Sequence, residues 1–267
     1  MAPRISVVLA THNNVETIES AVDSVLNQSF RDFELLIICD GSQDGTCELI
    51  KKYSSLENVS IIELETNIGK PLAFNIAVAH SKGIWIGVMD GDDIWLENKL
   101  ETQMAFLLDN PEVQVLGTNL LRFGVWGQET FPSKLYLSND SIHQQFTFAK
   151  MGFNNPTVLF QKKAFYAVGG YRGHMVRVED FDLFLRMHRT GMQFANLKDV
   201  LVHYRTSSIT QPFSYWFRNE IKKWQSLREN RYPWPFRFYL TSRLAYFVMF
   251  FRMVLYFGVL KCIRRDK

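Results

Sequence analysis

Short, mostly apolar runs of residues alternate with helical patterns along the first third of the chain. The runs cover residues 5–9, 35–39, 59–64 and 85–89 and are rich in Val, Ile and Leu. Strands that are buried on both faces of a parallel sheet have this composition. Pro71 suits the first turn of the helix that follows the third run. The alternation predicts an open, mostly parallel α/β sheet with flanking helices.

Polar residues gather where these strands are expected to end. They are residues 11–13 after the first run, 40–44 after the second and 90–93 after the fourth. In open α/β sheets, ligands bind outside the carboxyl ends of the strands. The sequence therefore predicts a ligand site at this edge of the sheet.

Beyond Leu108 the alternation loosens, and the second half is expected to cover the sheet and bind a second ligand. Short strands are predicted at 113–116, 158–160 and 200–204, with helices at 179–189 and 215–229. We expect one α/β domain over 1–212, divided into halves of about 1–110 and 111–212, followed by a helical segment over 213–267.

The segment 213–267 differs in composition from the rest. Residues 214–267 carry 12 Lys and Arg against 3 Asp and Glu, whereas the preceding residues have a net charge of −6, and they hold 15 of the 38 aromatic residues. Residues 244–260 are uncharged except for Arg252. Basic and aromatic composition favours contact with a membrane surface. A buried packing or dimer helix, a true membrane span and nucleic-acid binding are the alternatives.

The chain has three cysteines, Cys39, Cys47 and Cys262, without a CxxC pair. The odd number argues against a disulfide framework and the spacing against a structural zinc site. The apolar run at 5–9 is too short for a secretory signal. We therefore expect a cytoplasmic protein in a reducing compartment.

Asp90-Gly91-Asp92-Asp93 places three carboxylates at the end of an expected strand. Their repulsion favours binding of a divalent cation, and Mg²⁺ or Mn²⁺ fills its remaining positions with water and phosphate oxygens. A solvated acidic turn is the simpler interpretation. The position at a strand end favours a bound nucleoside diphosphate.

Three further segments admit both structural and functional interpretations. Asp40 to Gly45 resembles half of a calcium loop but has Lys51 where a bidentate Glu is needed, so a turn or a nucleotide contact remains. Residues 67–70 could hold phosphate or form a plain loop. Glu179 and Asp180 open a helix, as capping residues or as a general base.

Taken in order, these motifs resemble a family 2 glycosyltransferase with the GT-A, Rossmann-like fold. The resemblance extends over about residues 3–210. It is carried by the stretch from Ile5 to Asn13, Asp40 to Thr46, Asn67 to Asn75, Asp90 to Leu96, Asn155 to Thr157, Gly169 to Tyr171 and Glu179 to Leu183.

This resemblance implies an inverting transfer of a sugar from a nucleotide sugar, usually a UDP-sugar, with Mn²⁺ or Mg²⁺ bound. By position, Asp40 would contact the nucleobase, Asp90 the nucleotide sugar and Asp92 the metal, and Asp180 would be the catalytic base. The donor-binding positions are Ala10, Thr11, Asn13, Asp40, Asn67, Gly69, Lys70, Asp90, Gly91 and Asp92, and the supporting ones are Glu179, Asp93, Trp95 and His203.

The chain departs from the family pattern at several positions. Ala10 replaces the usual Pro, Cys39 the usual acid and Phe74 a frequent Arg, and no His follows Tyr204-Arg205. His203 precedes that pair, where an alternating strand would make it packed or solvated.

By analogy with bacterial surface-polysaccharide enzymes, such as those making O-antigen or capsule, the acceptor is expected to be a lipid-linked saccharide. Residues 213–267 would then dock the enzyme on the inner face of the cytoplasmic membrane. We expect no nucleic-acid partner and leave a homodimer open. The alternative functions are a catalytically inactive nucleotide-sugar-binding partner and a nucleotidyltransferase.

Overall fold

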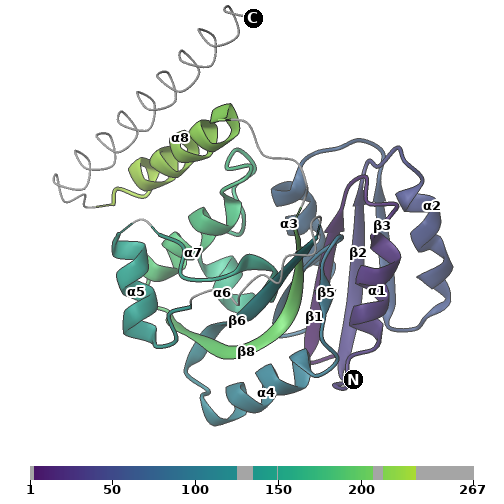
Figure 1. Ribbon diagram of the computed structural model, residues 1–267, viewed down its shortest axis with the longest axis horizontal. Helices are drawn as coiled ribbons and strands as arrows, with labels where there is room; N and C mark the ends of the chain where they lie inside the picture. Colours follow the sequence, from purple (N-terminus) through teal and green to yellow (C-terminus); the bar gives the residue numbers. More distant parts are fainter. Residues whose placement is uncertain (1–2, 125–134, 149, 207–212, 233–267) are drawn as a thin grey trace, which may run out of the picture. The chain divides into compact units, whose positions relative to one another are not determined.

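A computed structural model describes residues 3–124, 135–148, 150–206 and 213–232 (Figure 1). Its strands are β1 (Ile5–Thr11), β2 (Phe33–Asp40), β3 (Val59–Leu64), β4 (Trp85–Asp90), β5 (Ile94–Trp95), β6 (Val113–Gly124), β7 (Leu159–Gln161) and β8 (Gln193–Thr206). The α-helices are α1 (Ile18–Leu26), α2 (Thr46–Ile50), α3 (Lys70–His80), α4 (Lys99–Asp109), α5 (Asn139–Thr147), α6 (Lys162–Ala167), α7 (Glu179–Arg189) and α8 (Phe213–Glu229). Two 3₁₀ helices, η1 (Lys51–Ser55) and η2 (Asn155–Thr157), complete the described elements.

The strands form one sheet in the order β3-β2-β1-β4-β7-β6-β8-β5. The first four are parallel, as the sequence predicts, because each is followed by a helix that returns the chain to the same end. The other half is mixed: β7 is antiparallel to β4 and β6, and β5 is antiparallel to β8. The prediction of a mostly parallel sheet therefore holds for the N-terminal half, whereas among the described strands of the other half only β6 and β8 pair in parallel.

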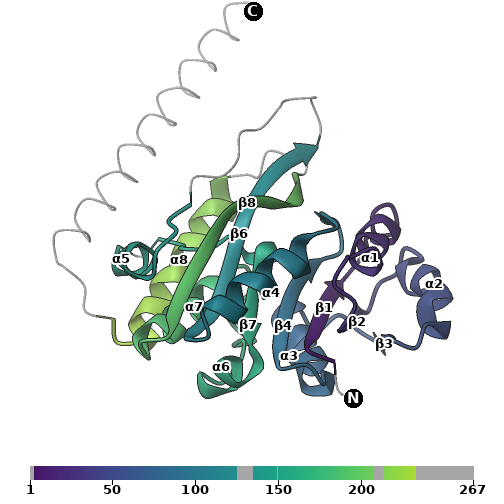
Figure 2. The ribbon, with the colours of Figure 1, turned by 90° about the horizontal axis from the view of Figure 1, so that it is seen from below.

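Helices cover both faces of the parallel half, with α1 and α3 on opposite sides (Figure 2). Val7 and Leu9 of β1 pack with Val22 of α1 in one buried core. Val8 points the other way, toward the face that Phe74 of α3 covers. This double burial explains the charge-free sequence of β1.

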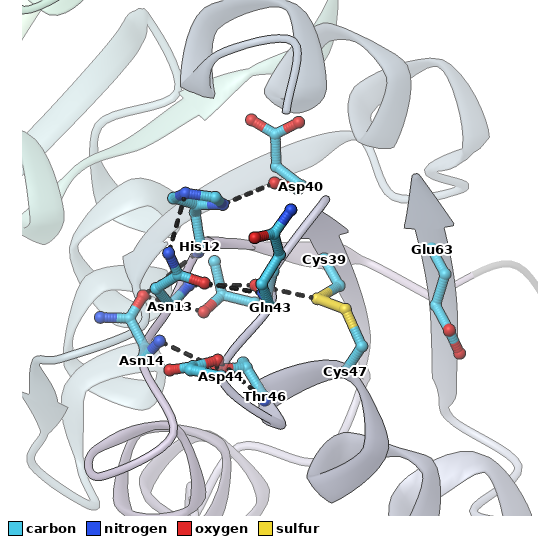
Figure 3. The surroundings of a disulfide bond; sticks show 12 residues. His12, Asn13, Asn14, Cys39, Asp40, Gln43, Asp44, Thr46, Cys47 and Glu63 are labelled. Atoms are coloured by element: carbon cyan, nitrogen blue, oxygen red, sulfur yellow. Dashed lines mark hydrogen bonds between the residues drawn. A yellow bond between two sulfur atoms is a disulfide. The ribbon is translucent and has the colours of Figure 1, made fainter. Parts of the chain in front are cut away.

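A disulfide joins Cys39, at the end of β2, to Cys47 in α2, with Cα atoms 5.8 Å apart (Figure 3). The expectation of reduced cysteines is wrong for this pair in the structure. The polar loop of residues 40–46 turns so tightly between strand and helix that its two ends meet. Neither the total number of cysteines nor the absence of a CxxC motif could predict that a turn would bring Cys39 and Cys47 together.

The chain divides into two compact units, Met1–Leu227 and Arg228–Lys267. This boundary lies later than the predicted one at 212, because α8 packs on α7: the buried Ser226 donates a hydrogen bond to Asp182 (2.7 Å). The nearly uncharged run at 244–260 lies outside the described residues. Among the residues that are described, no helix is long and apolar enough to cross a membrane.

Candidate active site

Two pockets adjoin at the carboxyl ends of β1, β2 and β4. One, of about 400 Å³, is lined by the strand-end loops and is called the loop pocket here. The other, of about 410 Å³, is lined by residues of β6, η2, α7, β8 and α8 and is called the α7 pocket. Lys70 and Asp90 line both, so this pair forms the wall between them.

The loop pocket contains most of the donor-binding positions suggested by the sequence. Asn13 is the exception, because it does not line the pocket. The predicted residues along its wall are Ala10, Thr11, Asp40, Asn67, Gly69, Lys70, Asp90, Gly91 and Asp92.

Asn13 instead ties two loops together (Figure 3). It has φ +55°, its backbone N–H donates to Ser42 Oγ (3.0 Å), and its Oδ1 accepts from the backbone N–H of Gln43 (2.9 Å). His12 Nδ1 lies 2.7 Å from the backbone oxygen of Asp40. These bonds hold residues 12–14 against the loop that the disulfide closes, and thereby shape the pocket.

Asp40, predicted to contact the nucleobase, is 3% exposed. Its Oδ1 accepts from the backbone N–H of Ile68 (2.8 Å) and its Oδ2 from that of Gly69 (2.9 Å). The carboxylate therefore fixes the loop that leads into α3. Gly41 beside it has φ +62°, and a Cβ there would lie 2.4 Å from the backbone nitrogen of Asn67. Only glycine permits this approach.

Lys70 forms an ion pair with Asp90 across the wall between the pockets, with Nζ 2.5 Å from Oδ1. Burial lowers the pKa of Lys70. The negative charges of Asp90, Glu179 and Asp180 raise it by more than burial lowers it, so the pKa of Lys70 lies above its usual value. The ammonium group is therefore a fixed cation at the N-terminus of α3. Phosphate oxygens bind favourably at such a position.

The acidic cluster after β4 fits a divalent cation. Burial and the charge of Asp90 raise the pKa of Asp92, and the same two causes raise that of Asp93 to about 8. Added positive charge would relieve this repulsion. The described part of the chain brings no three His, Cys, Asp or Glu side chains together as a metal site. Asp92 in the loop pocket thus suits Mg²⁺ or Mn²⁺, which complete their coordination with phosphate and water oxygens.

The α7 pocket contains Glu179 and Asp180 at the start of α7. Asp180 Oδ1 accepts from the backbone N–H of Phe181 (2.7 Å). Burial and the neighbouring Glu179 raise the pKa of Asp180 to about 7. A carboxylate with such a pKa can accept a proton from a hydroxyl group at neutral pH.

Three supporting residues from the sequence lie outside both pockets. Asp93 is fully buried, and its Oδ1 accepts from the backbone N–H of Arg205 (2.8 Å). Trp95 donates from Nε1 to the backbone oxygen of Pro156 (3.2 Å). His203 packs beside Phe123, with ring centroids 6.2 Å apart. The three join β4, β5 and η2 to β8 and its neighbours, which supports the packed interpretation of His203.

The structure adds pocket residues to which the sequence assigned no role in the site. His12 and Asn14 flank the predicted Asn13 in the loop pocket. Asn155, Arg177, Tyr204 and Tyr215 line the α7 pocket. No local pattern distinguishes these four, because long-range packing brings η2, β8 and α8 together. Asn155 and Tyr204 lie within the motifs at 155–157 and 204–205, and Arg177 lies two residues before the motif at 179–183, whereas Tyr215 lies near none of them.

The Rossmann-like sheet has acidic residues at the end of β4, with the Lys70 ammonium group beside them and the Asp180 carboxylate in the neighbouring α7 pocket. This is the arrangement expected of a GT-A glycosyltransferase. Residues 6–173 match the glycosyl transferase family 2. The chain belongs to this family, and it is accordingly a glycosyltransferase.

Known proteins agree with this assignment. The chain is 34% identical over 209 residues to the O-antigen biosynthesis glycosyltransferase WbnJ of Escherichia coli, which covers 75% of this chain and 79% of WbnJ. Its fold is similar to S. aureus TarS 1-349 in complex with UDP-GlcNAc (TM-score 0.64, 20% identity, 78% and 60% of the two chains). It is also similar to the Pyrobaculum calidifontis mannosyltransferase PcManGT in complex with GDP-Man and Mn²⁺ (TM-score 0.64, 16% identity, 88% and 66%).

Proposed function

We propose that the protein transfers a sugar, with inversion, from a nucleotide sugar to a hydroxyl group of a saccharide, and that the donor is a UDP-sugar. One observation carries the proposal: the wall formed by Lys70 and Asp90 separates a pocket of strand-end loops from a pocket that holds Asp180. A donor with its diphosphate at Lys70 would present its sugar to the α7 pocket. Inversion needs a base on the face opposite the leaving group, and Asp180 meets that need.

In the reaction, the acceptor oxygen forms a bond to the anomeric carbon while the bond from that carbon to the phosphate oxygen breaks. Asp180 takes the proton of the acceptor hydroxyl, and the nucleoside diphosphate leaves with the electron pair of the broken bond. Lys70 offsets the negative charge that develops on the departing diphosphate. Asp90 holds Lys70 in place through their ion pair.

Asp92 would hold the divalent ion. When bound, Mg²⁺ or Mn²⁺ supplies further positive charge to the diphosphate. TarS with UDP-GlcNAc supports the choice of a UDP-sugar, and PcManGT with GDP-Man and Mn²⁺ supports the metal.

We further propose that the acceptor is a lipid-linked saccharide in surface-polysaccharide biosynthesis, on the cytoplasmic face of the membrane. The likeness to WbnJ supports the pathway class. The basic and aromatic composition of the C-terminal residues supports the membrane surface.

Calorimetric titration with UDP, with and without Mn²⁺, tests the donor site. We expect binding that depends on the metal and is lost in Asp92→Ala but kept in Asp109→Ala, which removes an exposed carboxylate at the end of α4. Metal-independent binding that Asp92→Ala does not change would overturn the proposal.

Transfer assays separate the two alternative functions. An inactive binding partner would bind UDP-sugars but modify no acceptor, and a nucleotidyltransferase would release pyrophosphate from nucleoside triphosphates. We expect transfer without pyrophosphate release, because Asp180 in the α7 pocket suits deprotonation of an acceptor hydroxyl.

A further inference from the structure

Two buried side-chain oxygens in the α7 pocket lack a hydrogen-bond donor. They are Glu179 Oε2 and Asn155 Oδ1, and neither has a partner among the described residues. Buried acceptors without a donor are rare and costly in folded proteins. Their occurrence together in one pocket indicates a ligand that brings donor groups to both.

Glu179 is held so that Oε2 remains available. Glu179 is only 9% exposed, and it is the first residue of α7. The apolar residues of this helix anchor it in the core. The carboxylate is therefore a fixed acceptor beside Asp180.

Asn155 stands on an equally rigid support at the start of η2. Thr157 Oγ1 accepts from the backbone N–H of Thr118 (3.0 Å) and donates to the backbone oxygen of Asn154 (2.8 Å). The backbone oxygen of Pro156 accepts from Trp95 Nε1. Because the backbone on either side is fixed, the position of Asn155 does not depend on a mobile loop.

The α7 pocket is lined mainly by polar and charged residues, but part of its wall is apolar or aromatic. Leu120, Phe153, Pro156 and Tyr215 line it, and Arg177 lies 4.8 Å from the Tyr215 ring centroid. A pyranose ring has apolar C–H faces and a rim of hydroxyl donors. The apolar residues of this pocket and its unpaired acceptors match that pattern.

We propose that Asn155 and Glu179 bind hydroxyl groups of the acceptor saccharide and select it by them. Asn155 and Glu179 line the α7 pocket and not the loop pocket, which assigns them to a saccharide rather than to the nucleotide. The inference rests on the proposed function. It adds Asn155 and Glu179 as specificity-determining residues next to the base.

The test measures saccharide binding by ligand-observed NMR on the protein saturated with UDP and Mn²⁺. The probes are p-nitrophenyl glycosides of glucose, galactose, N-acetylglucosamine and N-acetylgalactosamine, with monodeoxy analogues of the tightest binder. The variants are Asn155→Ala and Glu179→Gln. Gln161→Ala is the matched control, because Gln161 also has an unpaired buried oxygen but lies outside both pockets.

We expect each variant to bind the glycoside at least tenfold more weakly, while UDP affinity stays within twofold and the control matches the wild type. One monodeoxy analogue should bind less tightly than its parent to the wild type and equally to Asn155→Ala. The Tm of Asn155→Ala should not fall, because its Oδ1 contributes no internal hydrogen bond.

Unchanged glycoside affinity in both variants would overturn the inference. So would a wild-type protein that binds UDP but no glycoside, and this result would leave the donor site of the proposed function intact. Loss of UDP binding by the wild type would instead refute the proposed function, and the inference with it.

Discussion

At the scale of single residues, the protonation of Asp180 is the property on which the proposed chemistry depends. Its position in the first turn of α7 favours the charged form through the helix dipole. Burial and the charge of Glu179 act in the opposite direction and raise its pKa to about 7. The carboxylate thereby becomes a stronger base than an exposed aspartate while remaining largely ionised at slightly alkaline pH.

The pH dependence of sugar transfer should show the titration of Asp180. The base acts only when deprotonated, so kcat/KM should rise about tenfold per pH unit below 7 and level off above it. Asp180→Asn should lower transfer by roughly 10²- to 10⁴-fold with UDP affinity unchanged, whereas Asp140→Asn, which alters a carboxylate of α5, should not. An unaltered rising limb in Asp180→Asn would refute the role of base.

Lys70 should contribute to the binding of UDP, through its diphosphate, but not to the binding of the nucleoside uridine. Because its ammonium group is fixed between the pockets, Lys70→Met should weaken UDP binding about ten- to a hundredfold, the range for one charge-assisted hydrogen bond. Uridine binding should not change. Lys82→Met, at an exposed lysine away from both pockets, is the control. Equal losses for UDP and uridine would place Lys70 away from the phosphates.

Residues of the loop pocket could be predicted from sequence because they follow strands that can be recognised locally. Asp40 and Asp90 each end a buried apolar run, and parallel strands bring such ends to one edge. Asn155 and Tyr215 belong to a 3₁₀ turn and a helix whose places depend on the packing of β6, β8 and α7. The mixed half of the sheet combines two very short strands, β5 and β7, with the long strands β6 and β8, whose pairing has register shifts. Its topology could therefore not be read from periodicity.

At the scale of elements, the polar loop of residues 40–46 between β2 and α2 both lines the loop pocket, through Asp40, and contributes to the stability of the fold. The disulfide from Cys39 to Cys47 closes this loop. Closing even a short loop limits the unfolded chain, so reduction should lower the free energy of unfolding by about 2 kcal/mol and the Tm by several degrees. Thermal melts with and without a phosphine reductant measure this effect.

The double variant Cys39→Ala/Cys47→Ala should melt at the same temperature with and without reductant. Cys262→Ser should respond to reductant as the wild type does. A wild-type Tm that reductant leaves unchanged would show that the two thiols are free in solution.

At the scale of the whole molecule, the contacts of α8 decide where the catalytic unit ends. Asp182 is fully buried and binds Arg186 of its own helix, with Nε 2.9 Å from Oδ2, as well as Ser226. Leu227 is 2% exposed. A chain cut at the boundary predicted from composition would lose Ser226, Leu227 and Tyr215 together, because composition changes before the packed structure ends.

Two truncations separate folding from membrane contact. A chain of residues 1–232 should keep the Tm and UDP affinity of the full protein, whereas 1–212 should melt at a lower temperature, since Asp182 loses the hydrogen bond from Ser226.

Residues 233–267 carry seven Lys and Arg and one Asp, and each basic residue contributes about 1 kcal/mol near an anionic membrane surface. The full chain should therefore float with vesicles of phosphatidylcholine and phosphatidylglycerol at low salt, and 1–232 should not. Flotation of 1–232 to the same extent would place the membrane contact on the catalytic unit, and failure of the full chain to float would leave the C-terminal residues a role in packing or dimerisation.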